Sequence, residues 1–278
     1  MTRESPSPKS LLEQYALRAK KHFGQNFLAD PGLAARIASL ATDPPGGTVV
    51  EIGAGLGALT APLLERASRV VAIERDRDLI PALEHRFAGA ITAQRLRVVE
   101  TDAKQADYAD LLAGPSPRSV AGNLPYHITG PLLRVAIELA PLVSRIVLLV
   151  QLEVGSRLAA KPGGSAYGAL SVFVQARFAV ERSFVVRRGA FYPQPGVDST
   201  VVVLDPLDSP IAEEDTAFRR VVGAAFAQRR KKLRNAWGSV ASAQNLEAAA
   251  ARANINLDAR GETLTPADFA RMAREVDR

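Results

Sequence analysis

The sequence predicts a doubly wound, Rossmann-like α/β domain followed by a small C-terminal helical domain. From Thr48 onward, short and nearly continuous apolar segments alternate with segments of helical periodicity, which is typical of a parallel sheet covered on both faces. After residue 151 this alternation ends and two β-rich runs follow. Beyond residue 213 the chain is Ala-rich and lacks strand patterns, so we expect this part to be helical.

The individual elements follow from the positions of the apolar runs and of the turn residues between them. Strands are expected, in chain order, at 48–52, 69–73, 96–99, around Val120 and at 145–151. Helices are expected at 59–67, 78–87, 131–139 and 153–160. The two later runs, at 178–186 and 199–204, predict an antiparallel end to the sheet.

Three segments follow from this layout. The first ten residues are polar and contain two Ser-Pro steps, so residues 1–20 are expected to be a disordered or basic extension. The stretch from Asp205 to Pro210 is rich in turn residues and marks a domain boundary. The α/β domain is therefore assigned to residues 21–206 and the helical domain to residues 207–278.

The composition is that of a globular protein, with 47% hydrophobic and 23% charged residues among 278. The absence of cysteine excludes disulfides and thiolate metal ligands, and the three histidines are scattered, so no metal is expected. The aliphatic run Ile146 to Val150 is far shorter than the ~20 residues of a membrane span. With no signal-peptide pattern either, we expect a cytoplasmic protein. The net charge of +6 favours a polyanionic partner.

Four successive strand ends carry glycine or polar residues, and ligands of open α/β sheets bind at such ends. The first end holds the glycine-rich loop from Glu51 to Gly57, whose backbone can approach a ligand closely. Glu74 follows the second strand and can accept hydrogen bonds from two ribose hydroxyls. Asp102 follows the third strand, where it can accept from an adenine amine, although a helix cap is its common structural role.

Asn123 follows the fourth strand and begins the sequence Asn123-Leu124-Pro125-Tyr126. An adenine N6 amine is a poor nucleophile because its lone pair is delocalised into the ring. An amide oxygen and a backbone carbonyl can accept its two N–H bonds, which draws the nitrogen towards a tetrahedral shape. Tyr126 can stack on the base, which contributes roughly 1–3 kcal/mol. The structural alternative is a strand-to-loop turn with a core tyrosine.

The glycine loop alone leaves a second class of function open. Gly53 and Gly55, followed by Ala58, also satisfy the dinucleotide fingerprint, and Glu74 lies near its expected acidic position. This pattern is compatible with an NAD(P)-dependent oxidoreductase. Asp102 and Asn123 shift the balance towards a ligand without phosphate, such as S-adenosylmethionine.

Several separate stretches resemble one enzyme family. The chain is similar to the S-adenosylmethionine-dependent rRNA adenine N6-dimethyltransferases, most of all to the KsgA/RsmA group that acts on the small ribosomal subunit. The resemblance runs from about Lys21 to the C-terminal region. It is carried by Phe23-Gly24-Gln25-Asn26-Phe27-Leu28, Glu51-Ile52-Gly53-Ala54-Gly55-Leu56-Gly57, Glu74-Arg75-Asp76, Asp102-Ala103, Asn123-Leu124-Pro125-Tyr126, Phe191 to Ser199 and Ala225 to Asn235.

The resemblance implies a role for each candidate site residue. Within the α/β domain, which would be the catalytic domain, the cofactor would be bound by Asn26, Leu28, Gly53, Glu74, Asp102 and Asn123. Of these, Asn26 and Leu28 would close over it, Gly53 would face its methionine portion, and Asn123 would lie between cofactor and target amine. The target base would be held by Asn123, Leu124, Tyr126 and Phe191. Phe191 has a structural alternative, an ordinary place in the core.

The helical domain would bind RNA or the ribosome. Five cations lie close together in it, at Arg229, Arg230, Lys231, Lys232 and Arg234. Like charges at this spacing destabilise an isolated helix, so a polyanion is a reasonable partner. The alternative is a solvated helix face. Arg187-Arg188 and the run from Arg18 to Lys21 would extend the same surface.

The function that the resemblance implies is methylation of two adjacent adenosines in the 3′-terminal hairpin loop of small-subunit rRNA. The enzyme would act as a monomer on a pre-30S particle, would release S-adenosylhomocysteine and would take part in ribosome biogenesis. An Erm-type enzyme that methylates the large-subunit rRNA is the close alternative. A ribosome-assembly factor whose main task is binding is a third possibility.

Overall fold

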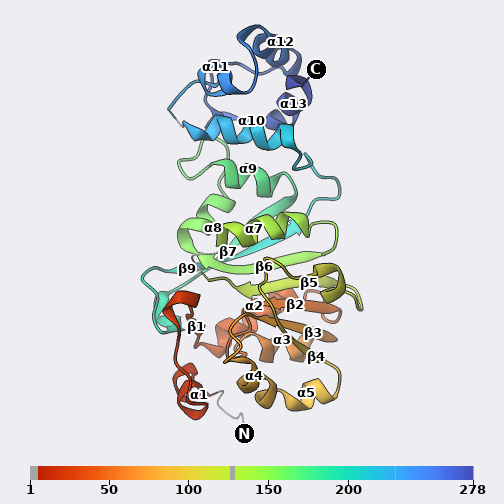
Figure 1. The fold of residues 1–278 in the computed structure, drawn as a ribbon, viewed down its shortest axis with the longest axis vertical. Helices are drawn as coiled ribbons and strands as arrows, with labels where there is room; N and C mark the ends of the chain where they lie inside the picture. Colours follow the sequence, from red (N-terminus) through yellow and green to blue (C-terminus); the bar gives the residue numbers. More distant parts are fainter. Residues whose placement is uncertain (1–5, 126–128, 229, 278) are drawn as a thin grey trace. The chain divides into compact units, whose positions relative to one another are not determined.

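In the computed structural model the chain folds as two compact units (Figure 1). The structure describes residues 6–125, 129–228 and 230–277. The first unit contains residues 1–155 and 181–205, and the second contains residues 156–180 and 206–278. The expected boundary near residue 206 is therefore only one of the places where the chain passes between units.

The first unit is built on a seven-stranded sheet with the order β4-β3-β2-β5-β6-β9-β7. Strands β2 to β6 pair in parallel, and β9 runs antiparallel to β6. The strands are β2 (Thr48–Ile52), β3 (Arg69–Glu74), β4 (Leu96–Glu100), β5 (Arg118–Asn123), β6 (Arg145–Gln151), β7 (Phe178–Val186) and β9 (Ser199–Pro206). This arrangement confirms the predicted doubly wound class, and the predicted strands agree with the observed ones to within a few residues.

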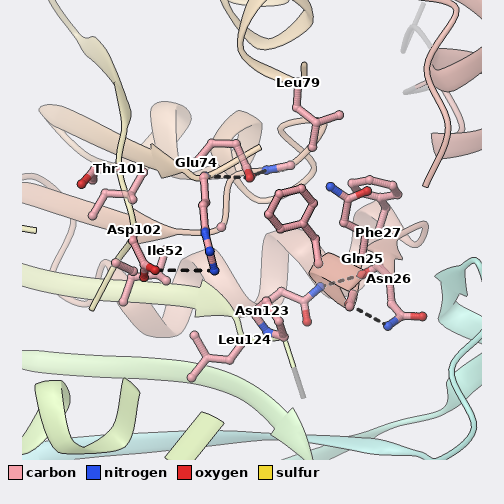
Figure 2. Close-up of a pocket in the computed structure, with 18 residues that line it drawn as sticks. Gln25, Asn26, Phe27, Ile52, Glu74, Leu79, Thr101, Asp102, Asn123 and Leu124 are labelled. Atoms are coloured by element: carbon pink, nitrogen blue, oxygen red, sulfur yellow. Dashed lines mark hydrogen bonds and ion pairs between the residues drawn. The ribbon is translucent and has the colours of Figure 1, made fainter. Parts of the chain in front are cut away.

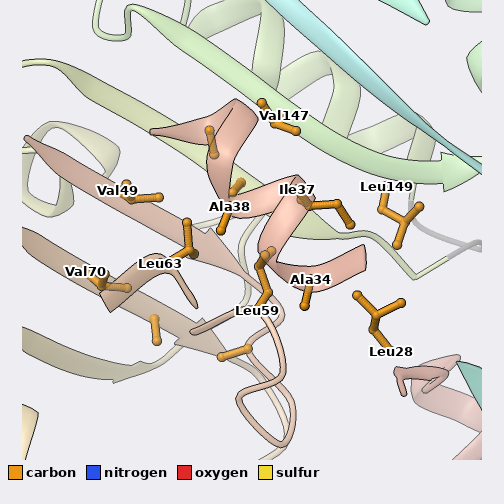
Figure 3. Packing of buried hydrophobic residues seen from close by; sticks show 14 of the residues in the cluster. Leu28, Ala34, Ile37, Ala38, Val49, Leu59, Leu63, Val70, Val147 and Leu149 are labelled. Atoms are coloured by element: carbon orange, nitrogen blue, oxygen red, sulfur yellow. The ribbon is translucent and has the colours of Figure 1, made fainter. Parts of the chain in front are cut away.

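Helices pack on the sheet through small and branched apolar side chains. They are α2 (Pro31–Ala41), α3 (Thr60–Arg66), α4 (Ile80–Arg86), α5 (Ala88–Thr92), α6 (Tyr108–Leu111), α7 (Thr129–Glu138) and α8 (Leu152–Leu158). Ile37 of α2 and Leu63 of α3 lie in one buried cluster with Val49 of β2, Val70 of β3 and Val147 of β6 (Figure 3). Each such side chain contributes about 1.5–3 kcal/mol when it is fully buried.

The N-terminal segment is more ordered than the sequence suggested. Pro8–Gln14 form helix α1, which Ser7 caps by accepting a hydrogen bond from the Ser10 N–H. Leu11 and Leu12 are buried in a cluster that also contains Phe27. The expected disorder of residues 1–20 is therefore wrong for 8–14, because α1 has its own apolar side to bury.

A two-stranded sheet forms beside the main one. Strand β1 (Phe27–Leu28) pairs antiparallel with β8 (Phe191–Tyr192) and follows the short 3-10 helix η1 (Lys21–Phe23). A second short 3-10 helix, η3 (Arg188–Ala190), leads into β8. The pairing fixes the N-terminal segment to a part of the chain more than 160 positions away.

The second unit is helical. It contains α9 (Ala169–Gln175), α10 (Thr216–Ala227), α11 (Leu233–Ala236), η4 (Trp237–Ser239), α12 (Ala243–Ala253), η5 (Gly261–Thr263) and α13 (Pro266–Val276). Trp237 is fully buried, and its indole N–H donates to the Val221 carbonyl at 2.8 Å. The ring of Phe173 in α9 meets that of Phe218 in α10 edge-on at 5.8 Å, which explains why α9 belongs to this unit.

In the part of the chain that the structure describes, every helix is too short or too polar to cross a membrane.

Candidate active site at the carboxyl ends of the strands

A cleft opens where the parallel strands end (Figure 2). It encloses about 800 Å³, open solvent included, a size that suits a small-molecule ligand. Strands β2 and β5 are neighbours, but the chain continues from them towards opposite sides of the sheet. Such a switch point leaves a crevice between two strand ends. A Cβ atom added to Gly53 would lie 3.7 Å from the Asn123 carbonyl oxygen, so these two strand ends are side by side.

The residues predicted for the site divide into three groups. Among the described residues, the cleft is lined by Asn26, Gly53, Glu74, Asp102, Asn123 and Leu124. Leu28 and Phe191 lie elsewhere, since both are buried in the hydrophobic cluster of the α/β unit and face each other across the β1–β8 pair. Tyr126 lies outside the described residues.

Phe191 occupies the core environment that was its structural alternative. Its side chain is 4% exposed, so the ring would have to leave the core to stack on a base. Leu28 is 5% exposed and borders a smaller cavity shared with Gly53 and Asn123. The stacking role of Phe191 and the cofactor contact of Leu28 stay predictions.

The glycine loop needs its glycines for conformation and for space. Gly53, Gly55 and Gly57 have φ values of +74°, +57° and +79°, which side chains strongly disfavour. A Cβ atom at Gly57 would lie 2.3 Å from the Phe87 ring, and one at Gly55 would lie 3.1 Å from the Phe27 ring. Glycine at these three positions therefore lets the loop follow this path along the cleft, which Gly53 and Gly55 line.

Glu74 ties two loops together below the cleft. Its carboxylate accepts hydrogen bonds from the backbone N–H groups of Gly55 at 2.8 Å, Arg75 at 2.9 Å and Asp76 at 2.8 Å. Burial raises the pKa of Glu74, and the three N–H donors oppose that shift. A dinucleotide site uses loop N–H groups of this kind to hold a pyrophosphate. Here the Gly55 N–H is directed at a carboxylate instead, which is unfavourable for a phosphate.

Asp102 closes another side of the cleft. Its carboxylate accepts from the Lys104 backbone N–H at 3.0 Å, and it lies 3.5 Å from the Arg75 guanidinium and 3.4 Å from the Lys104 ammonium. The next helix, α6, is capped by Asp107 rather than by Asp102. The helix-cap alternative for Asp102 therefore does not hold, and the carboxylate remains at the cleft.

The amide of Asn123 has a fixed orientation. Its Nδ2 donates to the backbone carbonyl of Asn26 at 2.9 Å (Figure 2). One of the two N–H groups of the amide is thereby engaged, which orients the side chain, and Oδ1 is left as an acceptor. The adjoining Leu124 is 1% exposed and its N–H donates to the Leu149 carbonyl at 3.0 Å, which anchors the chain just after Asn123.

A buried acid that the sequence reasoning did not single out holds the Asn26 segment in place. Asp76 is 2% exposed and accepts hydrogen bonds from the Lys20 ammonium at 2.5 Å and from the Gln25 amide at 2.7 Å. Burial alone would raise the pKa of Asp76, but the hydrogen bonds from Lys20 and Gln25 lower it. The only signal in the sequence was the second acid in Glu74-Arg75-Asp76, which carries no information about a partner 56 positions earlier.

Glu51 is a second buried acid, at the end of β2. It is 1% exposed, and its Oε2 accepts from the Thr60 hydroxyl at 2.6 Å. Burial is the main influence on this group and raises its pKa to about 8, with a smaller contribution from the negative charge of Glu74. Glu51 also borders the smaller cavity between Gly53 and Asn123.

Replacing Glu51 with glutamine is expected to flatten the pH profile of stability. An unfolded carboxyl ionises near 4.5 and the folded one near 8, so the wild-type free energy of unfolding falls as pH rises between these values. The limiting slope for one proton is about 1.4 kcal/mol per pH unit. Glutamine is neutral and keeps an oxygen for Thr60. Urea unfolding of both proteins from about pH 5 to pH 8 measures how the free energy of unfolding changes with pH. Parallel profiles for the two proteins would contradict a raised pKa of Glu51.

The cationic run of the helical unit lies mainly in a turn. Arg230, Lys231 and Lys232 fall between α10 and α11, and Arg234 lies in α11, whereas Arg229 is outside the described residues. Lys232 pairs with Asp258 at 3.2 Å, and Arg234 pairs with Glu247 at 3.1 Å. Arg230 and Lys231 are exposed and have no acidic partner within the described part of the chain. Of the four described cations, only Arg234 lies on a helix, so the alternative of a solvated helix face fits Arg234 alone.

Comparison with known proteins identifies the family. The model of the family described as ribosomal RNA adenine dimethylase matches residues 16–278. The chain belongs to this family. A relative from Anaeromyxobacter sp. (strain K), named ribosomal RNA small subunit methyltransferase A, is 46% identical, and the match covers 99% of this chain and all of the relative.

Solved structures agree with this family. A dimethyladenosine transferase from Plasmodium falciparum matches with a TM-score of 0.72 and 25% identity, covering 88% of this chain and 95% of its own. The 23S rRNA methyltransferase ErmE matches with a TM-score of 0.69 and 27% identity, covering 91% of this chain and all of its own. The predicted resemblance is confirmed, and the oxidoreductase alternative is wrong.

Proposed function

We propose that this protein transfers methyl groups from S-adenosylmethionine to N6 of two adjacent adenosines in the 3′-terminal hairpin loop of small-subunit rRNA. The observation that carries the proposal is the Asn123 amide, whose donor end is held by Asn26 and whose acceptor end is left for a ligand amine. The similarity to a relative named for the small subunit, at 46% identity over nearly the whole chain, supports the choice of RNA.

The residues around the cleft fit this cofactor. Glu74 has one lone pair left, on Oε2, for a ribose hydroxyl, Asp102 can accept from the adenine amine, and the Gly53 backbone lies next to Asn123, where the methionine portion would be placed. Arg75, which lines the cleft, and Lys104 both pair with Asp102. This donor set suits a nucleoside with hydroxyl and amine groups better than a phosphate. When bound, S-adenosylmethionine supplies an activated methyl group.

The chain's own residues would then activate and position the acceptor. Asn123 Oδ1 and the Leu124 carbonyl accept the two N–H bonds of adenine N6, and these bonds strengthen as the nitrogen becomes tetrahedral. We expect Tyr126, which lies outside the described residues, to stack on the base. Because the donor methyl is already activated, positioning supplies most of the rate and a strong general base is unnecessary. The proton lost from N6 passes to water.

Mass spectrometry of rRNA tests this function directly. Purified protein is incubated with isotopically labelled S-adenosylmethionine and either pre-30S or large-subunit particles. The expected product is N6,N6-dimethyladenosine at two adjacent positions near the 3′ end of the small-subunit rRNA. Label in the large-subunit rRNA would favour the Erm-type alternative, and unlabelled RNA would favour an assembly factor that only binds. We further infer that the protein acts in the cytoplasm as a monomer.

Neutralising Arg230 and Lys231 is expected to weaken RNA binding and to flatten its salt dependence. These two cations are unpaired among the described residues and can release counterions from RNA phosphates. For single strands each phosphate contact contributes about 0.7 to the slope of log K against log salt. The Arg230→Ala/Lys231→Ala variant should therefore lose about 1.4 from that slope. Titrations at several salt concentrations measure it.

The paired cation Lys232 provides the matched control. Because its ammonium is held by Asp258, Lys232→Ala should change the salt slope less than the loss of either unpaired cation. Equal slopes for wild type and the double variant would show that these cations do not contact RNA and are simply solvated.

A further inference from the structure

The β1–β8 pair has two chemically different faces. Leu28 lies opposite Phe191, and Phe27 lies opposite Tyr192. In an antiparallel pair, directly opposed side chains share a face, and successive residues alternate between faces. Leu28 and Phe191 are both buried in the core of the α/β unit, so Phe27 and Tyr192 share the other face.

Part of that other face borders the cleft. Phe27 lines the cleft, and its ring lies close to Gly55 of the glycine loop. Tyr192, directly opposite Phe27 in the pairing, is 38% exposed. It is absent from the described residues that line the cleft itself, so its exposed ring lies outside the cleft, on the strand that pairs with Phe27.

Exposed apolar side chains gather in this part of the sequence. Among the described residues, three of the four large hydrophobic side chains that are exposed come from positions 185–197: Val185, Tyr192 and Val197. Arg187 and Arg188 lie in the same segment and are exposed. Arg187 pairs with Asp198 at 2.8 Å, and the Arg188 backbone N–H donates to the same carboxylate at 2.9 Å. Asp198 thereby anchors the segment and leaves the Arg188 guanidinium available to an anion.

We propose that Tyr192 and Arg188 hold the nucleotide next to the target adenosine in a single-stranded part of the RNA. The proposal rests on the proposed function and adds an RNA contact to it. The phenol ring would stack on the neighbouring base, and the Arg188 guanidinium would contact a phosphate. A target base inside the cleft and its neighbour on Tyr192 would then be splayed apart, as single-stranded RNA allows.

The charge of the segment favours RNA over an apolar protein partner. Two exposed arginines precede the exposed aromatic ring in the same segment, and stacking on an aromatic ring combined with cationic contacts is how proteins bind single strands without reading their sequence. Successive residues of β8 point to opposite faces, so Phe191 is buried and Tyr192 is exposed. The β1–β8 register therefore explains why Tyr192, rather than Phe191, is available for stacking in this structure.

Replacing Tyr192 tests the contact. Tyr192→Ala should raise the Kd for a protein-free, fluorescein-labelled RNA hairpin from the small-subunit 3′ end by about tenfold, a typical loss for one stacked base. The Kd for S-adenosylhomocysteine should not change. Tyr192→Phe keeps the ring and should bind like wild type, whereas Tyr192→Leu keeps an apolar side chain without a ring and should bind like the alanine variant.

Leu142 provides a matched control. It is 36% exposed, close to the value for Tyr192, but it precedes β6 and so lies at the amino end of the strands, away from the cleft. Leu142→Ala should leave RNA binding unchanged. Equal RNA affinity for Tyr192→Ala and Leu142→Ala would overturn the proposal. A loss confined to particles that contain ribosomal proteins would also overturn it, because the partner would then be a protein.

The outcomes separate this inference from the proposed function. Wild-type protein that leaves adenosines unmethylated in every RNA would contradict the function but would leave the binding assay informative. Active wild-type protein with an unchanged Tyr192→Ala affinity would contradict only the RNA contact.

Discussion

Replacing Asn123 with alanine is expected to lower kcat by about a hundred- to a thousand-fold, the usual cost of removing one hydrogen-bonding group that acts on the transition state. The Asn123 amide is oriented before any substrate arrives, because the Asn26 carbonyl holds its Nδ2 at 2.9 Å. The oxygen that accepts from the target amine would be lost. The groups expected to hold the cofactor, Glu74 and Asp102, would stay in place, so cofactor affinity should change little.

Single-turnover methylation of pre-30S particles measures the loss, and calorimetry with S-adenosylhomocysteine measures cofactor binding. Asn245→Ala removes an exposed amide from α12 and provides the control for loss of a surface asparagine. Full activity of the Asn123 variant would remove this residue from the mechanism. A parallel loss of cofactor affinity would instead assign Asn123 to cofactor binding alone.

The sheet could be predicted because its information is local. Apart from β4 at the sheet edge, each parallel strand is a short apolar run that is buried on both faces, as at Val49-Val50 and at residues 146–150. Once the strands were assigned, their carboxyl ends followed, and with them the residues that meet at the cleft. Gly53 and Asn123 are neighbours in the structure because β2 and β5 pair, a consequence of the doubly wound order.

The parts that escaped prediction depend on distant pairing. Strands β1 and β8 have only two residues each, too few to show an alternation, and their register decides which aromatic ring is buried. A shift of one residue would exchange the faces of Phe191 and Tyr192. The hydrogen bonds from Lys20 and Gln25 to Asp76 also join residues more than 50 positions apart, so no local pattern announces them.

The helical unit shows the same limit. Its helices α10 to α13 follow a helical pattern that is visible in the sequence, but the inclusion of residues 156–180 is set by packing. Tyr167 is fully buried and its hydroxyl donates to the Leu264 carbonyl at 2.9 Å, a contact between segments that the sequence analysis assigned to different domains. Domain boundaries drawn from turn residues alone therefore miss residues 156–180, which belong to the helical unit although they precede the last strand of the sheet.

Replacing Glu74 with alanine is expected to raise the Kd for S-adenosylmethionine about ten- to a hundredfold and to destabilise the fold. The one acceptor site that the backbone leaves free can take one hydrogen bond from a ribose hydroxyl, and a hydrogen bond to a charged group contributes about 1.5–3 kcal/mol. The variant would also leave the Gly55, Arg75 and Asp76 N–H groups without their acceptor. Each buried donor without a partner costs about 1–3 kcal/mol, so the free energy of unfolding should fall by several kcal/mol unless water enters.

Calorimetry measures the affinity, and urea unfolding measures the stability. Glu84→Ala removes an exposed carboxylate from α4 and should change neither. Glu74→Gln separates the two roles, because its amide keeps the size of the side chain and one acceptor oxygen but turns an NH₂ group towards backbone donors. It should therefore fold better than the alanine variant and still bind the cofactor poorly. Wild-type affinity for the cofactor in both Glu74 variants would show that Glu74 only holds the three backbone N–H groups in place. The ribose would then be bound by other residues.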